Sequence, residues 1–420
     1  MEATTAPAKI GSRTVARLVA EFLARRGVRR VYGLCGGHIQ PIWDEVARAG
    51  IQIVDVRHES AAVYMAQAQA DLTGSLGVAM VTAGPGLTNA ATGIANANVS
   101  RSPVLVISGR PPRPQAGMGA LQDIPQGDLV RPICRRVETV SERHHVLPLL
   151  EATVRAAEGV GTPAGPAYID FPTDLLREVV TDADVDDRLF EPRVPGSLVP
   201  SRDTVSEAAA LIREGKRLLV ISGRGAREAT DELAAFLQTS GALYLDTAES
   251  RGVIPLDHPA AVPAARAKVM AEADVVITVG RKLDFQLAYG SPAVFWADAR
   301  FVRLGTSSDE LSDNRRGNAE LRGDVSATLK RCLRRMPSPN IRIPRGSKRC
   351  GPTIARRPKS SWRVWAGSHV GPTGVCTLKP SWQRSTGLST GTRSWWQMAE
   401  TSSRSLVPLC GRRPTWILAP

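Results

Sequence analysis

The chain has 420 residues, of which 43% are hydrophobic and 22% are charged, a composition typical of soluble globular proteins with two or three domains. It contains no apolar run long enough to span a bilayer, and its first residues lack the pattern of a secretory signal, so we expect a cytoplasmic protein without a membrane partner. The net charge of +14 does not indicate a nucleic-acid partner, because residues 341–420 hold 14 of the 54 Lys and Arg but one of the 40 acids, which leaves residues 1–340 at +1.

Residues 10–180 alternate short apolar strands with helical segments. The predicted strands are residues 28–34, 51–56, 76–82 and 103–108, and the predicted helices are residues 14–26, 41–48 and 60–72, with another helix beginning at Leu87. This alternation predicts an α/β domain with a parallel, Rossmann-like sheet covered by helices. Ligands of such sheets bind at the carboxyl ends of the strands, where glycine-rich turns follow two of these strands.

Five motifs occur in order along this first domain. They are residues 32–37 (YGLCGG), 56–59 (VRHE), 82–89 (TAGPGLTN), 103–109 (PVLVISG) and 165–174 (GPAYIDFPTD). Each motif alone is a weak signal. Together, and at this spacing, they resemble the pyrimidine-binding domain of thiamine diphosphate-dependent enzymes, in particular the acetolactate synthase family. The resemblance implies that Gly36 and Gly37 lie on the first cofactor-binding turn.

The resemblance assigns the main catalytic role to Glu59, placed at the end of a strand. In this family a carboxylate at the pyrimidine ring promotes the tautomer that activates the cofactor, while the protein sets its tautomer and orientation. By spacing alone, Glu59 could instead be an exposed residue that pairs with Arg57. The pair His58-Glu59 is not a zinc-protease motif, because Ala62 stands where the second histidine would be.

Four further residues of the first domain are candidates for the same site. Pro85, Gly86 and Asn89 lie on a turn whose backbone can approach a flat ring closely, although an ordinary loop-to-helix turn would have the same composition. Gln122 resembles the active-site glutamine of the family, on a loop that crosses to the partner subunit's site. The alternative for Gln122 is a solvated amide on a loop.

A central domain is predicted at residues 190–340, after an acidic and then proline-rich linker at residues 181–200. Its predicted strands are residues 216–222, 243–246 and 273–281. Gly223 and Gly225 form half of a dinucleotide fingerprint, which lacks its third glycine. In acetolactate synthases the equivalent domain binds FAD, and Arg281 could pair with a flavin phosphate or cap the sheet edge. Residues 259–272 are shorter than in the family, which leaves a Rossmann-like spacer without FAD as the alternative.

Residues 344–420 have the composition of an irregular tail. Six of the eight tryptophans lie here among many Arg, Ser, Pro and Gly, and we find no helical or alternating apolar period. A basic disordered tail, an RNA-binding tail and an out-of-frame reading all compete. In a shifted frame, the codons of residues 395–402 permit Val-Ala-Asp-Gly-Gly-Asp-Phe, which resembles the start of the family's third domain. We therefore favour out-of-frame sequence.

No metal site is predicted for this chain. Its six cysteines form no Cys-x-x-Cys pair, and the family's Gly-Asp-Gly…Asn motif, which binds Mg²⁺ and through it the diphosphate, does not occur. In the family the active site lies between one subunit's first domain and another's third domain, in a homodimer or tetramer. We therefore expect only the pyrimidine half of a thiamine diphosphate site, and a chain that is inactive alone.

The resemblance implies a reaction in branched-chain amino acid biosynthesis. An intact relative would decarboxylate pyruvate on thiamine diphosphate and transfer the two-carbon unit to a second 2-oxo acid. An oxalyl-CoA decarboxylase or an aldehyde lyase of the same superfamily is the alternative within this class. A non-catalytic fragment that pairs with an intact relative, or a product without function, are the alternatives outside it.

Overall fold

The computed structural model describes residues 13–160, 163–181, 185–192 and 196–336. Two parallel sheets with alternating helices confirm the predicted α/β class. They fall within the predicted domains at residues 10–180 and 190–340, whose limits stay predictions. The predicted tail at residues 344–420 lies outside the described residues. None of the helices that the structure describes is long and apolar enough to cross a membrane.

The first sheet has six strands in the order β2-β1-β3-β4-β6-β5, and every neighbouring pair is parallel. The strands are β1 (Arg30–Gly33), β2 (Gln52–Asp55), β3 (Gly77–Val81), β4 (Val104–Arg110), β5 (Val137–Thr139) and β6 (Pro166–Pro172). The helices are α1 (Val15–Arg25), α2 (Gln40–Arg48), α3 (Glu59–Thr73), α4 (Pro85–Ser100), α5 (Gln126–Val130), α6 (Val146–Glu158) and α7 (Thr173–Leu176).

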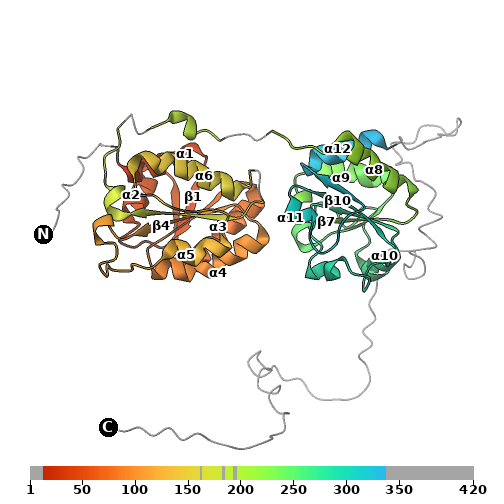
Figure 1. Ribbon diagram of the computed structural model, residues 1–420, viewed down its shortest axis with the longest axis horizontal. Coiled ribbons are helices and arrows are strands. Elements are labelled where there is room, and N and C mark those ends of the chain that lie inside the picture. The colour runs from red at the N-terminus through yellow and green to blue at the C-terminus, as the bar shows by residue number, and fades with distance from the viewer. Residues whose placement is uncertain (1–12, 161–162, 182–184, 193–195, 337–420) are drawn as a thin grey trace, which may run out of the picture. The chain divides into compact units, whose positions relative to one another are not determined.

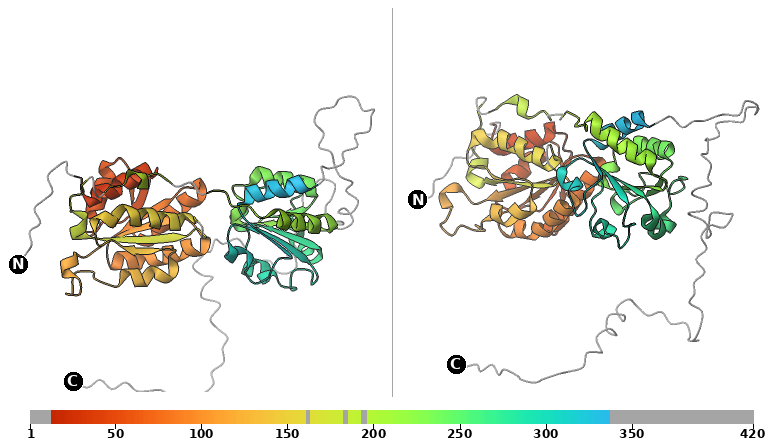
Figure 2. Two further views of the ribbon diagram at one scale, coloured as in Figure 1. Left: turned by 45° about the horizontal axis from the view of Figure 1, so that its top comes forward. Right: turned by 45° about the vertical axis from the view of Figure 1, so that its right-hand side comes forward.

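Helices cover both faces of this sheet, as Figure 1 and the turned views of Figure 2 show. Successive side chains of a strand point to opposite faces. In β3, Val78 and Met80 therefore join the core under α1, α2 and α6, while Ala79 and Val81 join the core under α3 and α4. Burial on both faces explains why β3 and β4 are apolar along almost their whole length.

The central sheet has five parallel strands in the order β11-β10-β9-β7-β8. The strands are β7 (Leu218–Ser222), β8 (Leu243–Leu245), β9 (Val275–Val279), β10 (Arg300–Gly305) and β11 (Ala319–Arg322). The helices are α8 (Arg202–Glu214), α9 (Thr230–Ser240), α10 (Arg266–Glu272), α11 (Ser308–Leu311) and α12 (Val325–Arg335). Side chains of α8, α9 and α12 form one core with this sheet.

The predicted strands and helices of both domains match the structure apart from their ends, and four strands were missed: β5, β6, β10 and β11. The helix predicted at residues 60–72 is α3 (Glu59–Thr73), and the strand predicted at residues 51–56 is the shorter β2. Strands β10 and β11 were not predicted. Strand β10 contains Arg303, whose side chain is fully buried and donates to the main-chain oxygens of Glu310 and Leu311. A charged residue in the middle of a strand breaks the apolar run that identifies buried strands in a sequence.

Candidate functional site

The predicted site residues of the first domain gather at one edge of the first sheet. Gly36 and Gly37 follow β1, Pro85 and Gly86 open α4 after β3, and Gln122 lies in the segment after β4. Strands β1, β3 and β4 are neighbours in the sheet, and they are parallel, so their carboxyl ends share an edge. The structure therefore brings residues from three separate segments of the chain to the edge where such sheets bind ligands.

Glu59 is the first residue of α3, not the end of a strand as predicted, because β2 already ends at Asp55. Its side chain is 6% exposed, and its Oε2 accepts a hydrogen bond from Nδ2 of Asn89 on α4, at 3.0 Å. Among the described residues, no group donates to the other oxygen, Oε1. The alternative pairing with Arg57 does not occur, since Arg57 binds Asp55 and is exposed. Glu59 is thus a buried carboxylate with one oxygen left to bind a ligand.

Two glycines let the neighbouring turns close around Thr82 and Glu59. A Cβ added to Gly36 would lie 2.5 Å from the Thr82 hydroxyl, and one added to Gly86 would lie 2.8 Å from the Thr82 methyl group. The added Cβ of Gly86 would also lie 3.6 Å from Oε1 of Glu59. Within the described part of the chain, the buried Thr82 hydroxyl has no hydrogen-bond partner. Gly37 faces open space, so packing gives no reason for a glycine there.

Gln122 lies on a partly exposed loop and contacts a residue of the turn after β1. It adopts a left-handed backbone conformation with φ of 62°, and its Cβ would lie 2.8 Å from a Cβ added to Gly84. Its side-chain Oε1 lies 3.1 Å from Nδ1 of His38, on the turn after β1. Gly84 itself has φ of 60°, a conformation that residues with side chains rarely adopt. The loop that carries Gln122 is therefore packed onto the turn that leads to Gly86.

Gln126, the first residue of α5, is a central residue of this edge that no sequence motif marks. It is 1% exposed, and its Oε1 accepts from the backbone N–H of Gly84 at 2.6 Å. Its Nε2 donates to the main-chain oxygen of Gly109 at 3.1 Å and lies 3.0 Å from the Tyr168 hydroxyl. One buried amide thus ties the turn after β3 to strands β4 and β6. Its position four residues after Gln122 is the single signal in the sequence that could have pointed to it.

Asp170 makes the stability of the first domain depend on pH. Burial raises the pKa of this fully buried carboxyl, against the opposing effects of Arg110 and of hydrogen bonds that include those from Tyr168 and Gln126. The folded state therefore holds the proton more tightly than the unfolded state, so this contribution to stability is complete below the ordinary carboxyl pKa of about 4 and is lost as the pH rises through the raised pKa.

We expect the Asp170→Asn variant to lose that part of the pH dependence. The measurement is the free energy of unfolding in urea at several pH values from about 4 to about 7, for the variant and the unchanged chain. The variant should give the flatter curve. Equal slopes for the two proteins would mean that Asp170 titrates alike in the folded and unfolded states.

The cysteines that the structure describes are expected to be poor nucleophiles. At Cys35, beside the turn of Gly36, burial and the nearby Asp44 and Asp55 raise the pKa of the thiol. Burial raises the pKa values of Cys134 and Cys332 to about 12. All three are therefore thiols at neutral pH, and iodoacetamide should modify them more slowly than free cysteine, as followed by peptide mass spectrometry. Rapid modification of Cys35 would contradict this expectation.

In the central domain, the glycines of the half fingerprint serve packing. The N–H groups of Gly223 and Gly225 donate to the main-chain oxygens of Val279 and Gly280, at 2.9 and 3.1 Å. A Cβ added to Gly225 would lie 2.8 Å from Cα of Gly280. These N–H groups, which would have to face a phosphate in a dinucleotide site, are thus already bound by the neighbouring turn.

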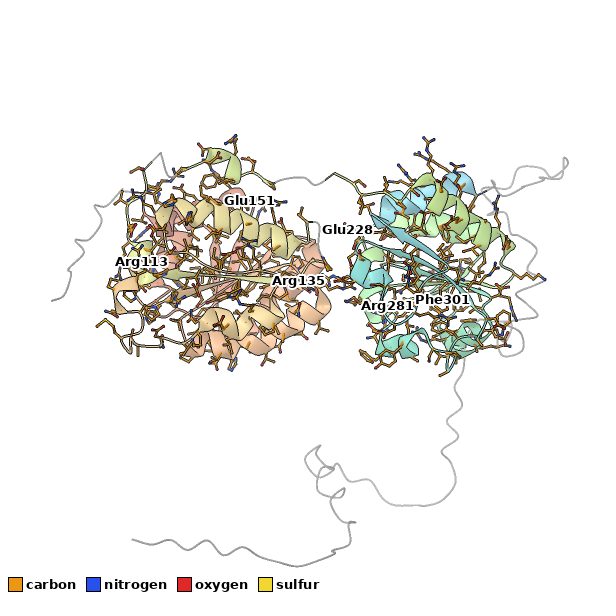
Figure 3. The ribbon with its side chains drawn as sticks, in the orientation of Figure 1. Arg113, Arg135, Glu151, Glu228, Arg281 and Phe301 are labelled. Carbon is orange, nitrogen blue, oxygen red and sulfur yellow. The ribbon has the colours of Figure 1, made fainter. Side chains whose placement is uncertain are left out.

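Arg281, labelled in Figure 3, follows β9 and is 3% exposed. Its guanidinium donates to both carboxylate oxygens of Asp284, at 2.9 and 2.7 Å, and to Oε1 of Gln286 at 3.0 Å. Helix α9, which follows the Gly225 turn, has Asp231 and Glu232 in its first turn, where they disfavour an anion. The residues present therefore do not fit the diphosphate of FAD, and they favour the spacer that the sequence left as an alternative.

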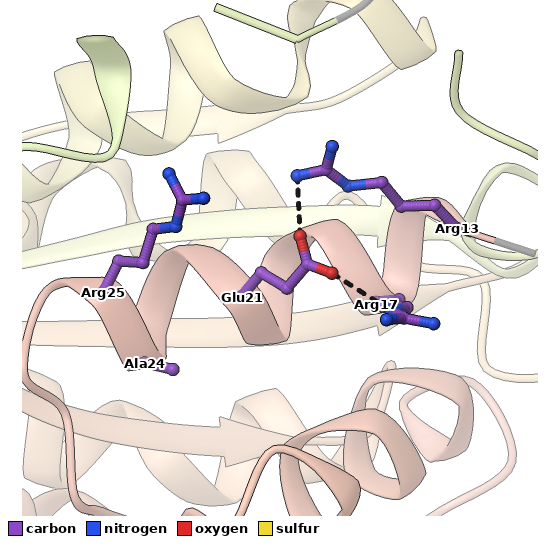
Figure 4. A pocket seen from close by; sticks show the side chains of 5 residues that line it. All are labelled: Arg13, Arg17, Glu21, Ala24 and Arg25. Atoms are coloured by element: carbon purple, nitrogen blue, oxygen red, sulfur yellow. Dashed lines mark hydrogen bonds and ion pairs between the residues drawn. The ribbon is translucent and has the colours of Figure 1, made fainter. Parts of the chain in front are cut away.

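A shallow hollow of about 480 Å³ lies along α1, away from all the predicted residues (Figure 4). The residues that line it are Arg13, Arg17, Glu21, Ala24 and Arg25. Its charges are paired: Glu21 binds Arg13 at 2.6 Å and Arg17 at 3.0 Å, and Arg25 binds Asp187 at 3.1 Å. The volume of this hollow does not by itself make it the ligand-binding site, because the buried polar groups that lie close together are those around Glu59.

Comparison with known proteins gives matches to both described domains. Residues 13–129 match the thiamine pyrophosphate enzyme N-terminal TPP binding domain, and residues 205–332 match the thiamine pyrophosphate enzyme central domain. The acetolactate synthase large subunit IlvG of Mycobacterium tuberculosis is 33% identical over 331 residues, which are 78% of this chain and 59% of that protein.

Lyases are equally similar to this chain. The 2-hydroxyacyl-CoA lyase 1 of Mus musculus is 33% identical over 326 residues, covering 76% of this chain and 55% of that protein. The 2-hydroxyacyl-CoA lyase 2 of Mus musculus is 35% identical over 306 residues, covering 65% and 48%. The chain thus spans between about half and three fifths of the length of these relatives.

Two parallel α/β domains, the first with a buried carboxylate at the edge where its strands end, are typical of proteins that bind a ligand at that edge. The matched domains show which class of protein this is. The chain belongs to the thiamine pyrophosphate enzymes, whose N-terminal and central domains it carries, and acetolactate synthases and 2-hydroxyacyl-CoA lyases are both among its relatives.

The residues around Glu59 fit the pyrimidine half of thiamine diphosphate. A flat ring needs a buried acceptor for its nitrogen and backbone without side chains beside it, and the free Oε1 of Glu59 lies next to Gly86. The buried Thr82 hydroxyl, which lacks a partner among the described residues, lies beside the same turn. For the metal the outcome differs: the described residues contain no group of three or more His, Cys, Asp or Glu that could hold Mg²⁺.

Proposed function

We propose that this chain carries the pyrimidine half of the active site of a thiamine diphosphate-dependent enzyme that acts on 2-oxo acids. The reaction would be that of an acetolactate synthase: decarboxylation of pyruvate and transfer of the two-carbon unit to a second 2-oxo acid, in the cytoplasm and in branched-chain amino acid biosynthesis. The observation that carries the proposal is the buried Glu59 carboxylate, held by Asn89 through one oxygen and free at the other.

Each residue of this site has a defined task in the proposal. When bound, thiamine diphosphate supplies the carbon nucleophile that attacks the 2-oxo acid. The Glu59 carboxylate accepts a hydrogen bond from a protonated nitrogen of the pyrimidine ring and so keeps that proton on the ring. Asn89 fixes the carboxylate in place. Pro85 and Gly86 bring the backbone close to the ring. Because Glu59 is buried, water is kept from the carboxylate, which strengthens its hydrogen bond to the ring.

The diphosphate and its Mg²⁺ would be held by residues other than those described here. The complete site therefore requires further residues that hold the diphosphate and the metal. A homodimer or tetramer is the arrangement that the resemblance implies. No nucleic-acid partner is proposed, because the excess positive charge belongs to residues 341–420.

A 2-hydroxyacyl-CoA lyase, which would cleave its substrate rather than join two oxo acids, is the second candidate function. Relatives with that name are as similar to this chain as the acetolactate synthase is. The test supplies the full chain with thiamine diphosphate and Mg²⁺ and offers either pyruvate or a 2-hydroxyacyl-CoA. Acetolactate formed from pyruvate supports the first function, and an aldehyde released from the thioester supports the second. Turnover of either kind by the chain alone would overturn the expectation that it is inactive alone.

For the central domain we propose a spacer that binds no flavin. The purified full chain, mixed with excess FAD and passed through a desalting column, should retain no visible flavin absorbance. The reason is that the N–H groups of Gly223 and Gly225 and the guanidinium of Arg281 are already bound within the domain. Retention of about one FAD per chain would contradict this proposal, and its loss in an Arg281→Ala variant would then assign the flavin to this edge.

A further inference from the structure

His38 and Gln122 come from different turns and meet at the ligand-binding edge of the first sheet. Nδ1 of His38 lies 3.1 Å from Oε1 of Gln122. His38 is partly exposed and lies in the turn that leads from Gly36 and Gly37 to α2. Neither the proposed role of Glu59 nor the family resemblance uses His38. The contact joins the turn after β1 to the loop after β4.

The contact determines which end of the Gln122 amide is free. An amide oxygen can only accept, so Nδ1 of His38 must carry the proton that is shared with Oε1. The amide nitrogen, with its two N–H groups, has no acceptor among the described residues. Gln122 is partly exposed, and its left-handed backbone is packed against Gly84. The nitrogen end of the amide is therefore available to a ligand, while the oxygen end is occupied.

We propose that His38 is a positioning residue, which orients Gln122 so that its amide N–H groups face an oxygen of the substrate beside Glu59. The substrate group would be the carbonyl or carboxylate oxygen of a 2-oxo acid, or the corresponding oxygen of an acyl thioester, since both accept hydrogen bonds and neither donates. This inference rests on the proposed function. Without His38 the amide can rotate, and either end can face the ligand.

The first test observes the ligand-free full chain, so it does not depend on cofactor binding. With six histidines in the chain, ¹⁵N-histidine labelling gives few signals, and the His38→Ala variant identifies those of His38. We expect Nδ1 to carry the proton in the unchanged chain. In Gln122→Leu the acceptor is lost, and the proton should move to Nε2, the nitrogen that isolated histidine prefers. A proton on Nε2 in the unchanged chain would overturn the proposal.

The second test asks whether the orientation of the amide matters to a ligand. The His38→Asn variant places an N–H close to the position of Nδ1, whereas His38→Gln reaches toward the position of Nε2. With saturating thiamine, pyruvate should shift the side-chain amide signals of ¹⁵N-labelled Gln122 in the unchanged chain and in His38→Asn. It should leave them unshifted in His38→Ala and His38→Gln. Equal responses of all four proteins would overturn the role of His38.

Thiamine binding separates this inference from the proposed function. His38 and Gln122 act on the substrate, so the affinity for thiamine should change by less than about twofold in His38→Ala. If Glu59→Gln leaves thiamine binding unchanged, the proposed function fails. If thiamine binds as expected but pyruvate does not shift the Gln122 amide signals in the unchanged chain, the proposed role of Gln122 and His38 is wrong. The proposed cofactor site is not affected by that result.

Discussion

Glu59→Gln is expected to lower the affinity of the full chain for thiamine by about tenfold or more and to reduce any turnover to background. The carboxylate is buried, so its hydrogen bond to the pyrimidine ring forms in a low-dielectric environment. Hydrogen bonds to charged groups contribute about 1.5–3 kcal/mol, and about 1.4 kcal/mol corresponds to a factor of ten in affinity. Gln has nearly the shape of Glu but no charge, so the protein should stay folded.

Thiamine is the appropriate probe because it has the pyrimidine ring and no phosphates. Its binding can be followed by calorimetry, with far-UV circular dichroism as the check on folding. A matched control is Glu45→Gln on α2, whose carboxylate pairs with Arg48 at the surface of the same domain. The control should bind thiamine as the unchanged chain does. Equal affinity in Glu59→Gln and Glu45→Gln would remove Glu59 from the site.

Gln126→Leu is expected to destabilise the first domain by about 3 kcal/mol, because it leaves the buried N–H of Gly84 and the oxygen of Gly109 without their partner, and each such group costs about 1–3 kcal/mol. Leu is close to Gln in size, so the loss would come from hydrogen bonds rather than from a cavity. Urea unfolding followed by circular dichroism measures the difference.

The matched control for this prediction is Gln122→Leu, four residues earlier in the same segment. Gln122 is partly exposed, and its amide makes one side-chain hydrogen bond, to His38, so its removal should change stability by about 1 kcal/mol or less. The two variants should therefore separate stability from ligand binding. Equal destabilisation by both would mean that the loop, and not the buried amide of Gln126, holds the edge together.

The fold was largely predictable because strands buried on both faces leave continuous apolar runs. Residues 76–82 and 103–108 were predicted in this way and correspond to β3 and β4. Strand β10 was not, because Arg303 interrupts its run, and its guanidinium donates to main-chain oxygens of Glu310, Leu311 and Arg315 in the segment that follows the strand. A buried charge of this kind depends on tertiary contacts that local pattern does not contain.

The site was predictable where a motif carries it and not elsewhere. Glu59, Gly86 and Asn89 were proposed from their motifs, and the structure places them near one another, although Glu59 begins a helix rather than ending a strand. Gln126 was missed because a buried amide has no signature of its own: its partners lie on the turn before α4 and on strands β4 and β6. Gly223 and Gly225 were interpreted as part of a dinucleotide fingerprint, whereas their neighbours explain them by close backbone packing.

The hydrogen bond between Gly84 and Gln126 also makes this edge of the sheet observable by amide hydrogen exchange. A turn N–H normally exchanges quickly with solvent, but that of Gly84 is bound to a side chain that is 1% exposed. Its exchange therefore requires the turn after β3 to separate from β4 and β6, since the same amide also binds Gly109 and Tyr168. The exchange rate of this one amide would report how often the edge opens, and a ligand bound beside Glu59 would slow it in proportion to its occupancy.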